Sequence, residues 1–211
     1  MEKLTETTLQ TYADLLDSDL PAPGGGSSGA YLGALGVSLA RMYAHLSFEK
    51  KSYLSLPEEN KAAFRMMFGE LLVIKEQFMD AVNTDADYYD AVIHAYRLPK
   101  TTPEETKVRT EAVETALIAA TEEPLRLSNL ALKAMSCIMN MLPYGNRNVI
   151  ADAYAGMQYL RTMIVCESYN IRSNANSLRN TDAAAQYLAE SERLLEQSAH
   201  LIGTMTQGES K

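Results

Sequence analysis

The sequence predicts an all-α protein. Apolar residues recur at helical spacing along nearly the whole chain, whereas the alternation typical of strands bounded by turns is absent. Clusters of proline, glycine and asparagine interrupt this pattern at only a few places, so the segments between them are long. We therefore expect one domain over residues 1–211, an antiparallel bundle of about six helices whose length favours dimerisation.

Composition excludes several classes of function. The net charge of -8 disfavours nucleic acid and anionic membranes as partners, since both require a basic face. Residues 20–40 carry no charge, but their many glycines, prolines and serines make them too polar to span a bilayer. Two cysteines and no signal peptide predict reduced thiols in a cytoplasmic protein. Three scattered histidines predict no metal site, and we expect no cofactor.

The first helix is expected over residues 5–16. Its apolar face consists of Leu9, Tyr12, Ala13 and Leu16. Residues 17–26 then form a loop, because they are polar at first and rich in proline and glycine at the end.

That loop ends in the run Ala22-Pro23-Gly24-Gly25-Gly26-Ser27-Ser28. Glycine lets backbone N–H groups approach a ligand closely. Either serine is suited to cap the next helix, whose first N–H groups form an anion site. A flexible connector is the alternative interpretation, but the run is short, bounded by prolines and followed by a strongly patterned segment.

The second helix is expected over residues 27–46, and small residues recur along it at every fourth position. These are Gly25, Gly29 and Gly33, followed by Gly36, Ala40 and Ala44. Each helical glycine costs roughly 1 kcal/mol relative to alanine. Such ridges allow another helix or a ligand to approach the backbone, and from Gly33 onward we expect close packing alone.

The remaining helices are separated by clear stop signals. A polar connector at residues 49–53 leads to Pro57, which suits the first turn of a helix to residue 98. Thr102 as cap, Pro103 and Glu105 then start the next helix, which runs to residue 142 with a kink expected at Pro124. After a turn at residues 143–146, helices are expected over residues 148–178 and 182–206.

Asp85 is the first candidate for chemistry. On a helix it shares a stripe with four apolar or aromatic residues, Tyr88, Tyr89, Val92 and Tyr96. Burial on such a stripe raises the pKa of a carboxyl group and makes it useful near neutral pH. The alternative is local: Thr84 caps a restarted helix, with Asp87 at its third position.

A second stripe of the same helix carries Asp90, His94 and Arg97. Such spacing is typical of a solvated row of salt bridges. Alternatively, Arg97 and Lys100 hold the carboxylate of a ligand.

The helix at residues 148–178 has an unusual mixed stripe. It consists of Asp152, Gly156, Tyr159, Met163, Cys166, Asn170 and Asn174. A buried asparagine needs partners for both its amide donor and its acceptor. An internal hydrogen-bond network provides them, and so does the amide edge of a pterin or purine.

Taken together, these segments resemble the cyclodeaminase/cyclohydrolase family, which comprises the C-terminal domain of formiminotransferase-cyclodeaminase and the stand-alone methenyltetrahydrofolate cyclohydrolases. The matching segments are Ala22 to Ser27, Asp85-Ala86, Arg97-Leu98-Pro99-Lys100, Pro103 to Glu105, Pro124, Gly145-Asn146 with Asp152, and Asn170 with Asn174. The resemblance covers almost the whole chain in order.

The resemblance implies an all-helical homodimer that acts on folate one-carbon units. Its members either convert 5-formiminotetrahydrofolate to 5,10-methenyltetrahydrofolate and ammonia, or open the methenyl bridge with water to 10-formyltetrahydrofolate. Both reactions require proton transfer at nitrogen, and Asp85 matches the family's essential aspartate. The implied substrate-binding residues are Gly24, Gly25, Gly26 and Ser27 beside the folate, Lys50, Lys51, Arg97 and Lys100 for its glutamate tail, Asn170 and Asn174 for the pterin edge, and Asn146 and Asp152.

The chain also departs from the family. Glu49-Lys50-Lys51-Ser52 stands where the family tends to have a glycine and three basic residues, and Asn83 replaces an aspartate. These changes bear on the substrate more than on the fold. Two other functions therefore remain, a catalytically silent folate- or pterin-binding protein and a helical dimerisation module. A folate site requires the glycine run, Asp85 and the stripe with Asn170 and Asn174 to line one cavity. A dimerisation module does not require this.

Overall fold

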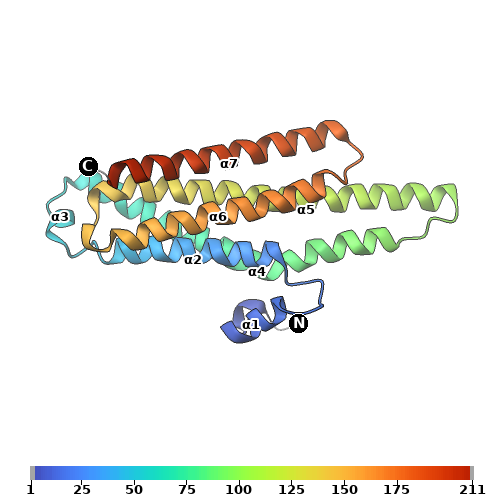
Figure 1. Ribbon diagram of the computed structural model, residues 1–211, viewed down its shortest axis with the longest axis horizontal. Coiled ribbons are helices and arrows are strands. Elements are labelled where there is room, and N and C mark those ends of the chain that lie inside the picture. Colours follow the sequence, from blue (N-terminus) through green and yellow to red (C-terminus); the bar gives the residue numbers. More distant parts are fainter. Residues whose placement is uncertain (1–2, 210–211) are drawn as a thin grey trace.

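The computed structural model describes residues 3–209, and all of its regular structure is helical (Figure 1). The elements in chain order are η1 (Leu4–Glu6), α1 (Leu9–Leu16), α2 (Gly25–His45), α3 (Lys51–Leu54), α4 (Glu58–Arg97), α5 (Pro103–Met141), η2 (Leu142–Tyr144), η3 (Arg147–Val149), α6 (Ile150–Ala175) and α7 (Thr181–Glu209). The predicted all-α class is confirmed. No helix in the described part of the chain is long and apolar enough to cross a membrane.

Five long helices lie side by side in the bundle, while α1 packs to one side of it (Figure 1). The hairpin of α4 and α5 extends beyond the start of α2. The core is formed by large apolar side chains from α4, α5 and α6, against which α2 presents alanine and glycine. The largest buried side chains on the three helices are Phe64, Leu71, Ile74, Phe78, Met135, Ile138, Met141, Met157, Leu160 and Met163.

The glycine ridge of α2 explains this close packing. A Cβ atom at Gly36 would lie 2.8 Å from the carbonyl oxygen of Gly156, and a Cβ atom at Gly156 would lie 2.6 Å from that of Gly36. A Cβ atom at Gly33 would overlap Met163. The backbones of α2 and α6 therefore touch directly, and close packing from Gly33 onward is confirmed.

The predicted start of α5 is also confirmed. The backbone N–H of Glu105 donates to Oγ1 of Thr102 at 3.1 Å, and Oε2 of Glu105 accepts from the N–H of Thr102 at 3.1 Å. This reciprocal capping box satisfies two N–H groups that the helix cannot pair itself, and Pro103 lies in the first turn.

Several local predictions were wrong. Helix α2 begins at Gly25 with Gly24 as its N-cap, so neither Ser27 nor Ser28 caps it. Helix α4 runs unbroken through Thr84, which caps nothing, and Pro57 precedes its first turn. The polar connector contains the short helix α3, and the first predicted helix is split into η1 and α1. Tertiary contacts override local preference at each point.

The end of the bundle where α2 finishes is closed by polar contacts and aromatic packing. The backbone N–H of Asn146 donates to Oγ of Ser47 at 2.8 Å, and Nδ2 of Asn146 donates to the carbonyl of Leu46 at 3.1 Å. Nearby, the Phe48 ring packs edge-on against Tyr53 and Phe64. These contacts fix the loop that joins α5 to α6.

Candidate active site

A cavity of about 360 Å³ lies where α2 begins, between α4, α5 and α6. Its lining combines the glycine run with Asp85 from α4, Glu123 from α5 and Glu167 from α6. Segments far apart in the sequence therefore meet here.

Asp85 lies against the first turn of α2. A Cβ atom at Gly26 would overlap its Oδ1 atom, so only glycine allows this approach. Burial raises the pKa of Asp85, a hydrogen bond from the backbone of Ser27 opposes the rise, and the charge of Glu123 adds to it. The free N–H groups at a helix N-terminus favour an anion, so this carboxyl group can be ionised although it is partly buried.

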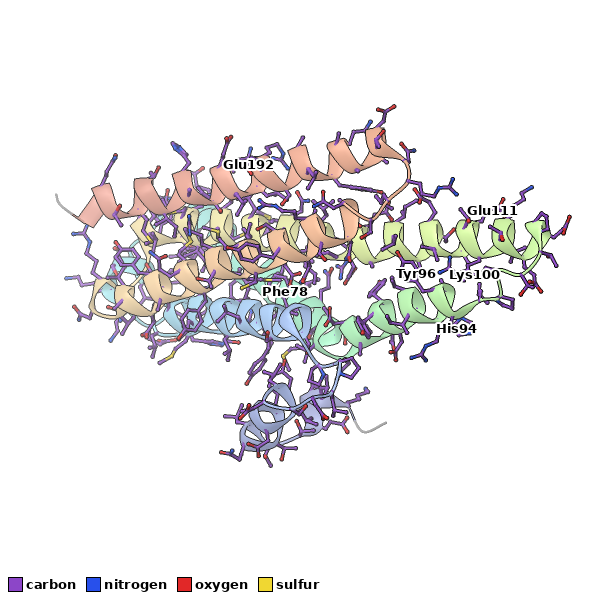
Figure 2. The ribbon with its side chains drawn as sticks, turned by 45° about the vertical axis from the view of Figure 1, so that its right-hand side comes forward. Phe78, His94, Tyr96, Lys100, Glu111 and Glu192 are labelled. Carbon is purple, nitrogen blue, oxygen red and sulfur yellow. The ribbon has the colours of Figure 1, made fainter. Side chains whose placement is uncertain are left out.

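The aromatic stripe of α4 lines the same cavity, as the spacing predicts. Tyr88, Tyr89, Val92 and Tyr96 all belong to the lining. In Figure 2, Tyr96 lies on the side of α4 that faces α5, whereas His94 points away from it. The guanidinium of Arg109 on α5 donates to the carbonyl of Tyr96 at 3.0 Å, which ties the two arms of the hairpin together.

Glu167 is the most deeply buried acid of the site. Its side chain is almost fully covered, with 1% exposed. Its Oε2 atom accepts from Nδ2 of Asn170 at 3.1 Å, and its Oε1 atom has no partner. Burial is the main cause that raises the pKa of Glu167 to about 8; the bond from Asn170 opposes it, and the charges of Asp85 and Glu123 add to it. This group is therefore largely protonated at neutral pH.

Glu123 differs from both because a cation holds it. Arg126 donates to its two carboxylate oxygens at 2.8 and 2.7 Å. A further nitrogen of Arg126 donates to Gln77 of α4 at 2.9 Å. This two-pronged pair fixes the position of the Glu123 carboxyl at the wall of the cavity, with an opposite charge beside it.

The structure brings many of the residues predicted from sequence together. Those lining the cavity are Gly24, Gly25, Gly26, Asp85, Asn170 and Asn174. Both asparagines also have internal partners, since Nδ2 of Asn174 donates to the carbonyl of Ala120 at 2.7 Å. Ser27 lies behind the lining, where its Oγ donates to the carbonyl of Val82 and contacts the Tyr12 hydroxyl, both at 2.9 Å.

Other predicted residues lie elsewhere. Lys50 and Lys51 follow the far end of α2, and Asn146 is bonded to Leu46 beside them. Asp152 lies 22 residues before Asn174 on α6, which is about 33 Å along a helix. The structure does not bring these four residues to the cavity, because long helices carry them to the opposite end of the bundle.

Arg97 and Lys100 lie at the end of α4 beyond Tyr96, exposed and outside the cavity lining. Figure 2 places Lys100 near the turn of the hairpin. Asp90, His94 and Arg97 are exposed as expected, but among residues 3–209 none of the three forms an ion pair, so the predicted row of salt bridges is absent.

Sequence reasoning missed Glu167 and Glu123. A signal for Glu167 was present, since it precedes Asn170 by three positions and Asn174 by seven, and so shares their face. Isolated glutamates are mostly solvent-exposed, and its burial depends on glycines of a distant helix. Within the described residues, no three His, Cys, Asp or Glu side chains are arranged to hold a metal.

This chain is similar to known proteins in sequence and in fold. The sequence profile of the Formiminotransferase-cyclodeaminase family matches residues 8–193. A methenyltetrahydrofolate cyclohydrolase from Methylorubrum extorquens is 30% identical over 194 residues, covering 92% of this chain and 91% of that one. A formimidoyltransferase-cyclodeaminase from Rattus norvegicus is 25% identical over 84% of this chain, which spans only 32% of the relative.

A solved structure shares the fold. The crystal structure of a formiminotetrahydrofolate cyclodeaminase from Thermotoga maritima matches with a TM-score of 0.81 at 19% identity, covering 99% of this chain and all of that one.

Proposed function

The chain belongs to the formiminotransferase-cyclodeaminase family, and from this premise we propose that it makes or opens the one-carbon bridge between N5 and N10 of tetrahydrofolate. The reaction is either the release of ammonia from 5-formiminotetrahydrofolate or the hydrolysis of 5,10-methenyltetrahydrofolate. The observation that carries the proposal is the partly buried Asp85 carboxyl, held against the first turn of α2 inside the cavity.

Both reactions pass through a tetrahedral carbon, and each needs a proton taken from a nucleophile. In the deamination N10 attacks the formimino carbon, and in the hydrolysis water attacks the methenyl carbon. Asp85 accepts the proton in either case as a general base. Burial raises the pKa of Asp85, and the hydrogen bond from the backbone of Ser27 offsets part of this rise.

The cavity suits a folate in size and lining. Its volume of about 360 Å³ falls within the range of small-molecule sites. The tyrosines of α4 offer aromatic faces to a pterin or aminobenzoyl ring, and Asn170 and Asn174 offer amide groups to the pterin edge. A substrate tail that leaves along α4 would meet Arg97 and Lys100. Lys50, Lys51, Asn146 and Asp152 are not part of the proposed site.

Each of the two reactions has its own support. The cyclohydrolase of Methylorubrum extorquens has nearly the same length as this chain and is 30% identical to it. The formimidoyltransferase-cyclodeaminases and the family profile favour deamination.

A spectroscopic assay for the methenyl chromophore separates them. Purified protein is offered 5-formiminotetrahydrofolate in one experiment and 5,10-methenyltetrahydrofolate in another. Appearance of the absorption band in the first identifies a cyclodeaminase, and accelerated loss of the band in the second identifies a cyclohydrolase. No change in either contradicts the proposed function and favours a silent binding protein.

Asp85→Asn tests the general base. We expect kcat to fall about 10²- to 10⁴-fold, with the far-ultraviolet circular dichroism unchanged. Asp87→Asn is the matched control, because Asp87 is exposed on the same helix and outside the cavity. Full activity of Asp85→Asn would rule out Asp85 as the base.

The proposal includes a homodimer, which the resemblance implies. Leu35 and Met42 on α2 and Leu46 at its C-cap are 38%, 48% and 41% exposed, and their spacing places them on one stripe. Burial of this stripe between two copies would support the dimer. Sedimentation equilibrium measures the mass, and a monomer at micromolar concentration would contradict it.

A further inference from the structure

The carboxyl groups of Asp85 and Glu167 both pack against glycines of α2. A Cβ atom at Gly26 would overlap Asp85, and one at Gly29 would lie 2.7 Å from Oε1 of Glu167. Positions three apart lie on one face of a helix, with Cβ positions about 5–6 Å apart. The glycines therefore bring the two acids side by side at the cavity, one turn apart, where any other residue would displace them.

Burial raises the pKa of both acids, but the groups that oppose this rise differ between them. Asp85 meets the N-terminal turn of α2 and receives a hydrogen bond from the backbone of Ser27, which favours its anion. Glu167 lies deeper, with only Asn170 as a partner and one oxygen unpaired. A buried carboxylate with a single donor and one unpaired oxygen is unfavourable, so Glu167 keeps its proton. Two titratable groups whose environments separate their pKa values are the usual arrangement for an acid and a base.

We propose that Glu167 is a second catalytic residue, the general acid that protonates the leaving nitrogen while Asp85 acts as the base. The inference rests on the function proposed above. It uses a side chain that lines the cavity and whose Oε1 atom is buried without a partner, for which the packing of the bundle provides no other role.

The proton balance holds for both reactions. In the deamination N10 bonds to the carbon of the protonated formimino group and gives its proton to Asp85. Glu167 then gives its proton to the amino group, the carbon–nitrogen bond breaks, and ammonia leaves the methenyl cation behind.

In the hydrolysis Asp85 takes a proton from the attacking water, Glu167 protonates N5, and the bond from N5 to the one-carbon unit breaks. Transfer of a proton from Asp85 to Glu167 resets the pair, and in the hydrolysis the second proton lost by water leaves to solvent.

Three titratable groups face Glu167. They are Asp85 from α4, Glu123 from α5 and the neighbouring Cys166 on α6, whereas α2 presents Gly29. Both acidic neighbours hinder ionisation of Glu167. Since Glu123 is paired with Arg126, the charge that changes during catalysis is that of Asp85.

Glu167→Gln is the decisive variant, because glutamine keeps the shape and a hydrogen-bond donor but has no transferable proton. We expect kcat to fall about 10²- to 10⁴-fold with KM little changed. In the wild type, kcat should fall as pH rises through about 8, the pKa of Glu167, and this alkaline fall should disappear in the variant. Glu122→Gln is the matched control, since Glu122 is exposed and accepts from Tyr187 on α7.

Several results would overturn the inference. An active wild type whose kcat does not fall near pH 8 contradicts Glu167 as the general acid, even if the variant does not fold. A Glu167→Gln variant with nearly full kcat, or with only a raised KM, makes Glu167 a binding residue. An inactive wild type instead contradicts the proposed function, and the catalytic role of Glu167 with it.

Thermal unfolding provides a measurement that is independent of activity. The pKa of Glu167 is raised in the folded state, from the ordinary value of 4.5 to about 8. The stability that its proton contributes is therefore fully present below pH 4.5 and is lost as the pH rises toward about 8. The melting temperature of the wild type should therefore fall between pH 5 and pH 8 relative to that of Glu167→Gln. A constant difference between the two proteins over this range would show that Glu167 is ionised throughout, and would overturn the inference.

Discussion

The two ends of α2 bury polar groups in opposite ways. At its C-terminal end Asn146 donates to both Ser47 and Leu46, and the hydroxyl of Tyr43 donates to the carbonyl of Leu142 at 3.1 Å. At its N-terminal end the acids face a cavity, and one oxygen of Glu167 has no partner.

The difference separates structure from function. Polar groups that bond to one another close a chain connection and stabilise the fold. Acids left in a cavity destabilise the fold and remain available to a substrate. The hydroxyl of Tyr53, buried without a partner, is the exception at the closed end. Substitutions at matched positions should therefore affect activity at one end and stability at the other.

The largest effect is expected for Gly26→Ala. The added methyl group overlaps the Asp85 carboxyl and must displace it, and a shift of about 1 Å at a catalytic group can reduce the rate about 100-fold. We expect kcat/KM in the methenyl assay to fall at least that much. Gly69→Ala is the control, since nothing lies within 4 Å of a Cβ atom there. Equal activity of the two variants would contradict the assignment of the N-terminal end of α2 to the active site.

A stability effect without a catalytic one is expected for Gly145→Ala. A methyl group at this position overlaps the ring of Tyr43, and overpacking of this kind costs about 1–3 kcal/mol. Urea unfolding should show the loss, whereas kcat at a temperature where the protein is folded should be unchanged. A loss of kcat without loss of stability would mean that the closed end takes part in the reaction.

The smallest effect is expected for Thr102→Ala. This change removes the cap of α5 and should lower the free energy of unfolding by about 1 kcal/mol. Thr101→Ala, one residue outside the cap, serves as its control in the same urea titration. If the hairpin unfolds separately from the bundle, the loss will appear in hydrogen exchange of α5 rather than in the global transition.

Local signals in the sequence predicted most of the fold. Thr102, Pro103 and Glu105 lie within four residues of one another, so their capping box could be recognised directly. The start of α2 could not be, because glycine has a low intrinsic helix propensity and the contact of Gly26 with Asp85 depends on tertiary structure.

The site was predictable only in part, for a similar reason. The spacing of Asp85 and the tyrosines follows from one helix, and the structure confirms that they line one cavity. Glu167 lies against Gly29, which is more than 130 positions earlier in the sequence, and no local sequence pattern predicts this contact. Spacing also does not say which end of a long helix meets the site, so the stripe from Asp152 to Asn174 could not be divided from the sequence.

The contact between Gly36 and Gly156 has a mechanical consequence. Because each backbone blocks the other, α2 cannot slide along α6 without a collision, and the contact holds the register of the two helices. Glu167 lies 11 residues beyond Gly156 on the same helix, so its depth in the cavity is set by this stop. We therefore expect one wall of the cavity to be rigid. We expect any movement on substrate binding to occur in the other wall, the hairpin of α4 and α5, whose tip extends past the end of the glycine ridge.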